Sequence, residues 1–584
     1  MILLFGGTTE GRVAAKVLEQ SGAVYYYSTR GNTQDIELVH GHHVSGAMEV
    51  PEMVTFCQEH DIRLIVDAAH PFAVNLHHNV VDLAGQIGVP VIRYDRIYPP
   101  HDEDLIWCKD YTDAIHQLEQ DGIESLLALT GVNTIGRLQA FWQEHECWFR
   151  ILNRDESLDK AQKSGFPTDH LVYYDKDDTV SLIEQLRPQA MITKESGKSG
   201  GFLEKVHAAR QAGIKVFVVE RPEYPSLPNV MIQHVNGPHG LRRMVEKLLP
   251  EFYALHSGLT TGTCATAAAI AATRRLTTGA MPSQVPVKLP NGETIHVGVT
   301  YGDDYTAVFK EAGDDPDVTN GIEIRASVES SDQFEILGGE GVGRFTVPGF
   351  DYPPGEPAIN KAPRQMMREN IRENVRITIS VPEGAAIARR TFNPRLGIEG
   401  GISIIGVSGI VKPFSEEAFI DSIRKCMQVA KVSGSDRVVI NSGGKSERFV
   451  KALYPDLPQQ AFVEYGNYIG ETLEMAHELG FKAVTLGVML GKAVKLAEGH
   501  LDTHSRKAVM NKEFVGQMLS EAGCDIDLNS ITLARELWEK LPADKLDAFA
   551  RTIIRHCSAY CAPLLPNGTL TILLIDDNGT IYKQ

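Results

Sequence analysis

The chain has 584 residues, of which 43% are hydrophobic and 23% charged, and its formal net charge is −18. This length suggests roughly three to four compact domains. The acidic balance, with no long basic stripe, excludes a general nucleic-acid binder, and no apolar run is long enough to span a membrane. The opening residues lack a secretory leader and the eight cysteines show no paired spacing, so we expect a cytoplasmic protein with reduced thiols and no bound metal.

Residues 2 to about 235 alternate short apolar runs with helical stretches of 3.6-residue period. The runs include ILLFGG, AVYYYST and RLIVDAA, and a second set follows with SLLALTG, QAMITKES and IKVFVVERP. Such alternation is typical of parallel sheets with helices on both faces. Two sets predict two lobes, which divide near residues 100–125.

The sequence changes character after residue 256. Residues 285–350 are rich in strand-like alternation and in Gly, Asp and Pro turns, whereas an α/β alternation runs from about 405 to the end. We therefore predict an α/β protein with an N-terminal domain at 1–250, in lobes of about 1–122 and 123–250. The C-terminal domain at 251–584 is expected to hold an α+β lobe at about 256–404 and an α/β lobe at about 405–584.

A candidate nucleotide loop follows the first predicted strand, in LFGGTTEGR. Glycines there let the backbone approach a pyrophosphate, and a helix N-terminus favours negative charge. A tight turn without a ligand has the same sequence, so the two interpretations stay open. The residues concerned are Gly6, Gly7, Thr8 and Thr9.

The second predicted strand ends in Ser28, Thr29 and Arg30. Dinucleotide-binding folds usually carry an acid here, for the ribose 2′-hydroxyl. Hydroxyls and a guanidinium suit a 2′-phosphate instead, which favours NADPH, with NADH as the alternative cofactor. An ordinary polar strand end has the same pattern.

Further polar residues follow other predicted strands. Asp67 ends a strand and His70 lies in the next turn, where α/β sheets expose functional groups, although a lone His in a turn is more often structural. Lys194 and Lys198 lie in a glycine-bearing loop after a strand of the second lobe. GKS here, and GGKSE at 443–447, lack the earlier glycine of a P-loop, so we interpret neither as one.

LFGGTTEGR, DAAHPFA with Arg93 and Arg96 downstream, LTG at 129–131, and TKESGKSGG followed by VVERP together resemble the precorrin-6A reductase family of corrin biosynthesis. The resemblance covers about residues 1–245 and implies two Rossmann-like lobes that reduce a tetrapyrrole with NADPH. It adds Thr130 and Gly131 to the cofactor-binding residues. Ala69 stands where the family has Thr, and YDKDD at 174–178 replaces an expected Gly-Pro-Phe.

A Gly/Thr cluster in TTGTCATAAAIAA at 260–272 precedes good helix formers and predicts a helix N-terminus. Cys264 falls in the first turns of this helix. Three interpretations are open: a small buried residue in an Ala-rich helix, an anion site at the helix start, and a nucleophile that needs a His base. The first is favoured.

Two charged groups follow this helix. Asp315 and Asp317 belong to three acids around a proline turn, which can hold Mg²⁺, although a solvated turn with Asx capping is the simpler interpretation. Arg364, Arg368 and Arg372 recur every four residues, which puts three guanidiniums on one helix face. Such a face could bind carboxylates. A solvated surface helix is the alternative interpretation.

TTGTCATAAA, GDDPDVTNG, GEPAINKAPR, NPRLGIEGGISIIG and GKAVKLAEG with THS resemble, in this order, the cobalt-precorrin-5B C1-methyltransferase family from about residue 256 to the C-terminus. The resemblance implies a second enzyme that uses S-adenosylmethionine, and Cys264 is then not a covalent nucleophile. Its candidate substrate-binding residues are Thr261, Asp315, Asp317, Asn360, Arg364, Arg368, Lys492 and His504. The glycine turns that we assign to the cofactor are Gly400, Gly401, Gly443 and Gly444.

The two resemblances imply consecutive steps, so we expect a bifunctional enzyme of cobalamin biosynthesis that acts on a polycarboxylate tetrapyrrole. In the N-terminal half, Arg93, Lys194 and Lys198 are expected to bind carboxylates, and Asp67, His70 or Lys194 to be catalytic. The alternatives are an N-terminal half that only binds the macrocycle, and a corrinoid carrier without catalysis. Association into a homo-oligomer is left open.

Overall fold

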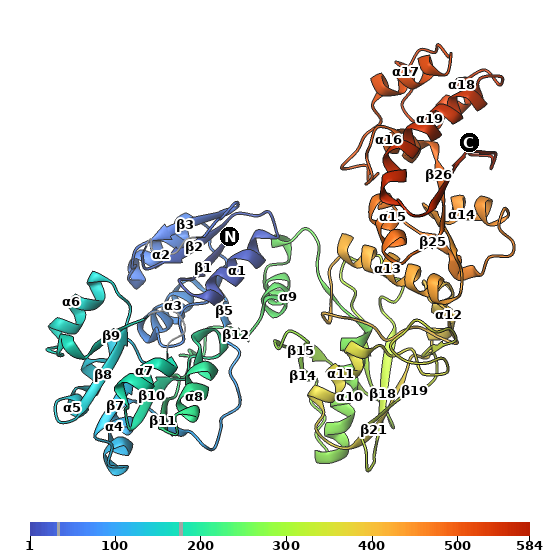
Figure 1. Ribbon diagram of the computed structural model, residues 1–584. Helices are drawn as coiled ribbons and strands as arrows, with labels where there is room; N and C mark the ends of the chain where they lie inside the picture. Colours follow the sequence, from blue (N-terminus) through green and yellow to red (C-terminus); the bar gives the residue numbers. More distant parts are fainter. Residues whose placement is uncertain (32–35, 175–178, 584) are drawn as a thin grey trace. The chain divides into compact units, whose positions relative to one another are not determined.

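The computed structural model describes residues 1–31, 36–174 and 179–583 (Figure 1). The chain divides into two compact units: Met1–His256 with Lys288–Ile295, and Ser257–Val287 with His296–Gln584. Most of the YDKDD segment, residues 175–178, lies outside the described residues. None of the described helices is long and apolar enough to cross a membrane.

The first unit contains two six-stranded sheets, and every strand pair in them is parallel. The first sheet has the order β12 (Ile232–Val235), β5 (Val91–Tyr94), β4 (Leu64–Asp67), β1 (Ile2–Phe5), β2 (Tyr25–Thr29), β3 (Gly41–Ser45). The second has the order β6 (Ile106–Cys108), β11 (Lys215–Val219), β10 (Ala190–Lys194), β7 (Ser125–Ala128), β8 (Glu146–Ile151), β9 (Leu171–Tyr173).

Helices cover both faces of each sheet, which explains why the central strands are continuous apolar runs. In the first sheet, Ile2 and Leu4 pack with α1 (Thr9–Glu19) and α9 (Pro238–Leu248), whereas Leu3 and Phe5 pack with α2 (Val50–Glu59) and α3 (Val74–Ile87). The second sheet lies between α4 (Tyr111–Gln120), α5 (Gln139–Trp142) and α6 (Asp155–Lys163) on one face and α7 (Thr179–Leu186) and α8 (Phe202–Gln211) on the other.

The two sheets differ from the predicted lobe division near residue 122. The second sheet already begins with β6, and β12 and α9 return to the first sheet after the second is complete. The strand β12 pairs with β5 over four residues, Ile232 to Val235 against Val91 to Tyr94. The first lobe is therefore discontinuous in sequence, because a distant strand completes its edge.

The first unit also includes the tip of a hairpin formed by β14 (Gln284–Lys288) and β15 (Thr294–Gly298). Glu293 at this tip is fully buried, and its Oε2 accepts hydrogen bonds of 3.0 Å from the backbone N–H groups of His239 and Gly240. These groups belong to the first turn of α9, where a carboxylate is stabilised by the helix dipole. The hairpin tip thus caps the N-terminus of α9.

The second unit begins with an α+β lobe. Its main sheet has the order β16 (Thr300–Tyr301), β17 (Thr306–Phe309), β18 (Glu323–Ser330), β21 (Val375–Ser380), β19 (Glu335–Gly338), and it is antiparallel except for β19 beside β21. The Ala-rich helix α10 (Thr261–Thr278) packs against β17 and β18, and α11 (Lys361–Asn370) packs against α10. Two short pairs join β13 (Gly258–Leu259) to β23 (Ile410–Val411) and β20 (Arg344–Phe345) to β22 (Ile398–Glu399).

A second α/β lobe ends the chain. Its sheet has the order β25 (Phe462–Glu464), β24 (Arg437–Asn441), β26 (Ala483–Met489), β27 (Thr569–Ile575), β28 (Ile581–Tyr582), and only β28 is antiparallel to its neighbour. The helices around it include α13 (Glu416–Val432), α14 (Gly444–Lys451), α15 (Ile469–Glu478), α16 (Leu490–Ala497), α17 (Lys512–Glu521), α18 (Glu536–Lys540) and α19 (Leu546–Cys561). The predicted fold class, parallel α/β lobes in the N-terminal half and an α+β lobe followed by an α/β lobe, is confirmed.

Candidate functional site

The predicted nucleotide loop joins β1 to α1. A Cβ on Gly6 would lie 2.3 Å from the Tyr27 ring, so only glycine fits there, and Gly7 has φ +86° with open space where a Cβ would lie. Thr8 caps α1 by accepting from the Gly11 N–H at 2.9 Å and donates to the Ala68 carbonyl at 2.6 Å. Thr9 is exposed in the first turn. The loop offers an open backbone at a helix N-terminus, which suits a phosphate group.

The other predicted cofactor residues of the first unit lie at strand ends. Ser28 is buried within β2 and Arg30, directly after the strand, is exposed; among the described residues at this strand end, 28–31, none is acidic. After β7, Thr130 shares a 2.7 Å hydrogen bond with Thr134, and Gly131 has φ +83° with open space around its Cα. Gly131 therefore leaves room beside the backbone after β7.

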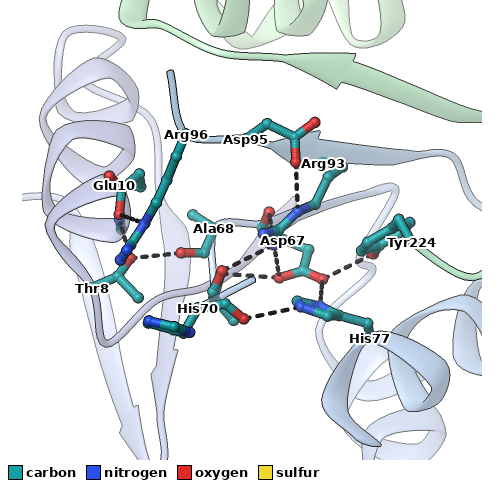
Figure 2. A network of polar contacts seen from close by, with 12 residues as sticks. Thr8, Glu10, Asp67, Ala68, His70, His77, Arg93, Asp95, Arg96 and Tyr224 are labelled. Carbon is teal, nitrogen blue, oxygen red and sulfur yellow. Dashed lines mark hydrogen bonds and ion pairs between the residues drawn. The ribbon is translucent and has the colours of Figure 1, made fainter. Parts of the chain in front are cut away.

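Asp67, at the end of β4, is the centre of a buried polar network (Figure 2). Its carboxylate accepts from His77 Nδ1 at 2.6 Å, the Tyr224 hydroxyl at 2.8 Å and Arg93 Nη1 at 3.0 Å. His77 Nε2 lies 3.0 Å from the His70 carbonyl oxygen. Both nitrogens of His77 thus face oxygen atoms of Asp67 and His70.

This network changes the roles of two predicted residues. Burial opposes ionisation of Asp67, but the hydrogen bond from His77 and the charge of Arg93 outweigh it and lower the pKa of the carboxyl to about 2. Asp67 is therefore an anion whose oxygens are already bonded, which does not suit a proton donor. Arg93 is 2% exposed, and its guanidinium also donates to Asp95 and to the carbonyl of Ala69. Its donors therefore bond other residues of the chain.

His70 lies in the turn that this network supports. Its Nδ1 accepts from the Phe72 N–H at 3.2 Å, so the proton of the neutral ring is on Nε2. Burial, and then the charges of Arg96 and Lys194, lower the pKa of His70 to about 3. Its side chain is a neutral donor that points away from the Asp67 network (Figure 2).

Lys194, from the second sheet, lies beside the turn that contains His70 and Phe72. It is the last residue of β10, and its Nζ lies 5.2 Å from the centroid of the Phe72 ring. Burial, with a contribution from the charge of Arg137, lowers its pKa to about 8. Among the described residues no carboxylate pairs with it. Lys198, four residues on, is exposed.

Sequence reasoning missed several residues of this site. Tyr224 and His77 carry no motif, and only the fold brings them to Asp67. Glu10 was also missed: it accepts from Arg96 Nε at 3.0 Å and from the Ser199 hydroxyl, while Arg96 donates to the Ser196 carbonyl at 2.7 Å. These contacts join the first helix to the loop after β10.

In the second unit, the start of α10 is closed by its own chain. The Gly262 N–H donates to the Ile405 carbonyl at 2.9 Å and the Thr263 N–H to the Thr260 hydroxyl at 3.2 Å. The Thr261 hydroxyl is buried and accepts from the Ile405 N–H at 2.8 Å. These contacts leave few N–H groups at the start of α10 for an anion. Cys264 is fully buried.

Several predicted substrate residues of the α+β lobe make local contacts. Asp315 accepts from the Phe414 N–H at 3.0 Å. Asp317 accepts from Lys310 at 2.7 Å; burial opposes its ionisation, but Lys310 and Thr319 outweigh it and lower its pKa. Arg364 donates to the Ile359 carbonyl at 2.9 Å and lies 3.2 Å from Glu356.

Two others remain accessible on α11. Asn360 precedes the helix as its N-cap residue without a side-chain cap hydrogen bond, and Arg368 is exposed, with its guanidinium 4.7 Å from the Phe334 ring centroid. The predicted stripe of three arginines on one helix face is wrong, because α11 ends at Asn370 and Arg372 lies beyond it. Of the two arginines on the helix, only Arg368 is free for a ligand.

A cavity of about 380 Å³ lies at the carboxyl ends of the last parallel sheet. It is lined by Ser442, Asn467, Met489, Gly491, Lys492, Lys495, Thr503, His504 and Ser505. Its size falls within the range of small-molecule sites. The lining follows β24, β25 and β26, where the strand order reverses, which is the usual ligand position in open α/β sheets. Two predicted residues, Lys492 and His504, therefore meet here.

Lys492 is one of two lysines that line this cavity. Its Nζ donates to the Gly466 carbonyl, and burial lowers its pKa to about 8 although Glu464 raises it. Lys495 donates to the Thr503 carbonyl at 3.2 Å. His504 Nδ1 accepts from the Arg506 N–H at 3.1 Å, which leaves Nε2 as the donor of the neutral ring.

The predicted cofactor glycines fall into two different settings. Gly443 has φ +150° and Gly444 has open space around its Cα, directly after β24 and beside Ser442 of the cavity. Gly401 is closely packed instead: a Cβ would lie 2.0 Å from the Gly341 carbonyl oxygen. Gly400 has φ +83° in the same turn. Within the described residues, no three His, Cys, Asp or Glu side chains gather as metal ligands would.

The fold joins an α/β half to a half with an α+β lobe and an α/β lobe, and several of the candidate sites lie at the carboxyl ends of parallel strands. Three family models match the chain: "Precorrin-6x reductase CbiJ/CobK" at residues 1–236, "CbiD" at 250–413 and "CbiD, C-terminal domain" at 502–584.

Curated relatives match about half of the chain. "Cobalt-precorrin-5B C(1)-methyltransferase" of Prosthecochloris aestuarii is 41% identical over 345 residues, which is 55% of this chain and 94% of the relative. The protein of the same description from Geobacillus sp. is 40% identical, over 52% of this chain and 88% of its own. The chain belongs to the cobalt-precorrin-5B C(1)-methyltransferase family and carries a precorrin-6x reductase domain before it.

Two solved structures are similar to parts of the chain. The cobalamin biosynthesis protein CbiD from Archaeoglobus fulgidus is 29% identical, with a TM-score of 0.26, over 44% of this chain and 83% of that one. The CobK precorrin-6A reductase is 20% identical, with a TM-score of 0.35, over 42% of this chain and 97% of that one.

Proposed function

We propose that the chain is a bifunctional enzyme of cobalamin biosynthesis. Its C-terminal half transfers a methyl group from S-adenosylmethionine to C1 of cobalt-precorrin-5B, and its N-terminal half reduces the product, cobalt-precorrin-6A, to cobalt-precorrin-6B. The observation that carries this proposal is the presence of both family domains in one chain. The product of one activity is the substrate of the other.

The cofactors supply the reacting groups: NADPH the hydride and S-adenosylmethionine the methyl. The chain has to bind and orient them and exclude water. NADPH is favoured over NADH because β2 ends in Ser28 and Thr29 and is followed by Arg30, with no acid among these residues. Replacing Arg30 with Ala should then raise KM for NADPH about tenfold or more, by loss of a charged contact, and leave KM for NADH unchanged.

In the reductase half, Lys194 is the proposed proton donor. It is a cation with a pKa lowered to about 8, nearer to neutral pH than an ordinary lysine, which suits a general acid. His70 is proposed to donate a hydrogen bond from Nε2 to the macrocycle, and Lys198 to bind a carboxylate at the rim. Asp67 and Arg93 position the His70 turn and do not touch the substrate.

In the methyltransferase half, the cavity beside Gly443 and Gly444 is the proposed cofactor site. Lys492, His504, Asn360 and Arg368 are the proposed contacts of the polycarboxylate. No covalent intermediate is needed, because the sulfonium already activates the methyl group.

The test is incubation of the full chain with cobalt-precorrin-5B, S-adenosylmethionine and NADPH, followed by mass spectrometry. A gain of one methyl and two hydrogens is expected. Methyl gain alone would support the alternative, in which the N-terminal half only binds the macrocycle. Tight macrocycle binding without either gain would favour a carrier.

A further inference from the structure

Glu464 occupies a special position in the last sheet. It is the final residue of β25 and lies opposite Asn441, the final residue of β24, in the parallel register. The turn Ser442–Gly443–Gly444 follows β24 directly. In dinucleotide-binding folds, the strand beside the glycine turn ends in an acid about 20 residues further on, which accepts the ribose hydroxyls. Glu464 matches this position relative to Gly443.

The two carboxylate oxygens of Glu464 have different surroundings. Oε2 lies 3.5 Å from Arg395 Nη1. Oε1 faces the glycine turn, since a Cβ on Gly443 would lie 3.4 Å from it. No described residue donates a hydrogen bond to either oxygen, and the side chain is one quarter exposed. An acid in this state has an acceptor available for a ligand.

The glycine turn has room on the same side. Gly443 adopts φ +150°, which side-chain-bearing residues rarely adopt, and a Cβ on Gly444 would meet nothing within 4 Å. The cavity of about 380 Å³ begins at Ser442 and continues to Lys492. Glu464 is close enough to Lys492 to raise the pKa of that ammonium. Acid, turn and cavity are therefore parts of one region.

We propose that Glu464 accepts the ribose hydroxyls of a nucleoside bound on the Ser442–Gly444 turn, and that this nucleoside is the adenosyl part of S-adenosylmethionine. The choice of this nucleoside rests on the proposed methyl transfer. Arg395 then holds Oε2, so that the carboxylate stays directed at the turn. The amino-acid end of the ligand extends into the cavity.

The test is calorimetric binding of S-adenosylhomocysteine and its 2′,3′-dideoxy analogue to the full chain. Wild type should bind the analogue about tenfold or more weakly, because charged hydrogen bonds are lost. In Glu464→Gln the affinity for S-adenosylhomocysteine should fall by a similar factor, while the affinity for the analogue is unchanged. Glu474→Gln, an exposed change on α15, is the matched control and should behave as wild type.

Two results would overturn the proposal: a wild type that binds both ligands equally, or a Glu464→Gln variant that retains the full preference for the hydroxyls. Equal loss of both ligands by a variant with wild-type circular dichroism would also contradict it. Failure of the proposed function is a separate result. A chain that shows the hydroxyl preference but methylates no cobalt-precorrin keeps the nucleoside site and loses the methyltransferase assignment.

Discussion

The Tyr224 hydroxyl donates a 2.8 Å hydrogen bond to Asp67 Oδ2, although the two residues are 157 positions apart. Tyr224 belongs to the segment that returns from the second sheet to the first, and its ring also lies 5.1 Å from that of His77. The return segment therefore holds the network that supports the His70 turn.

Tyr224→Phe should lower the reductase kcat about tenfold, because a small displacement of a catalytic turn has large effects, and leave methyl transfer unchanged. Its unfolding free energy should fall by about 1–3 kcal/mol, since Asp67 loses a buried donor. Steady-state assays of both activities provide the check. Tyr173→Phe, at an exposed tyrosine of β9, is the control. Equal loss of both activities would contradict the assignment.

Asp67→Asn should destabilise the first unit by about 3 kcal/mol at pH 7, because Arg93 and His77 lose their buried anion. The folded pKa of about 2 lies below the ordinary value of about 3.9, so the stabilisation is present above pH 4 and is lost as pH falls through 2. The difference between wild type and variant should shrink across that window.

Urea titrations at several pH values measure this, with tryptophan fluorescence as the readout, since three of the four tryptophans (Trp107, Trp142 and Trp148) lie in the first unit. Asp104→Asn, at a largely exposed carboxylate, serves as control. A difference that stays constant from pH 7 to pH 2 would show that Asp67 is not the titrating anion.

The reductase rate should fall as pH rises through about 8, because Lys194 then loses its proton. Lys194→Met should remove this alkaline limb and lower kcat about a hundredfold. Rate profiles from pH 6 to 10 provide the measurement. Lys215→Met, at a lysine paired with Asp121 on the surface, should keep the wild-type profile.

Lys492→Met should raise KM for cobalt-precorrin-5B or S-adenosylmethionine about tenfold or more, because the cavity loses one of its two lysine charges. Reduction of cobalt-precorrin-6A by the same variant should proceed at the wild-type rate. Lys482→Met, a lysine exposed on the same lobe, controls for loss of charge. An unchanged KM for both ligands would remove Lys492 from the site.

Cys264→Ala should retain methyl transfer, because the thiol is fully buried in α10. A stability loss of about 1 kcal/mol is expected from the small cavity that the change leaves. Product analysis by mass spectrometry decides the point. Abolished turnover in a folded variant would restore the nucleophile interpretation.

Much of the fold could be predicted from local pattern. The run ILLF is apolar at every position because helices cover both faces of its sheet, and the same holds for the second sheet. The return of β12 to β5 could not be predicted, since pairing between strands that far apart leaves no local signal.

The sites divide in the same way. Gly7, Lys194 and Lys492 were found because strand ends and glycine turns have sequence signatures. Arg93 was expected to face the substrate, and its burial against Asp67 depends on neighbours that only the fold brings together. The distance of Glu464 from the glycine turn in the sequence is typical of an acid that binds ribose hydroxyls. This spacing could be interpreted only once β25 was known to lie beside β24.

The position of β12 has a consequence for synthesis on the ribosome. The first sheet lacks its edge strand until residues 232–235 have emerged, whereas every strand of the second sheet is present by residue 219. Since domains fold as units during translation, the lobe encoded in the middle can be completed before the one that begins the chain. A nascent chain that has emerged from the ribosome as far as residue 219, and not yet as far as residue 232, should therefore carry a protease-resistant second lobe beside a first lobe that is still cleaved.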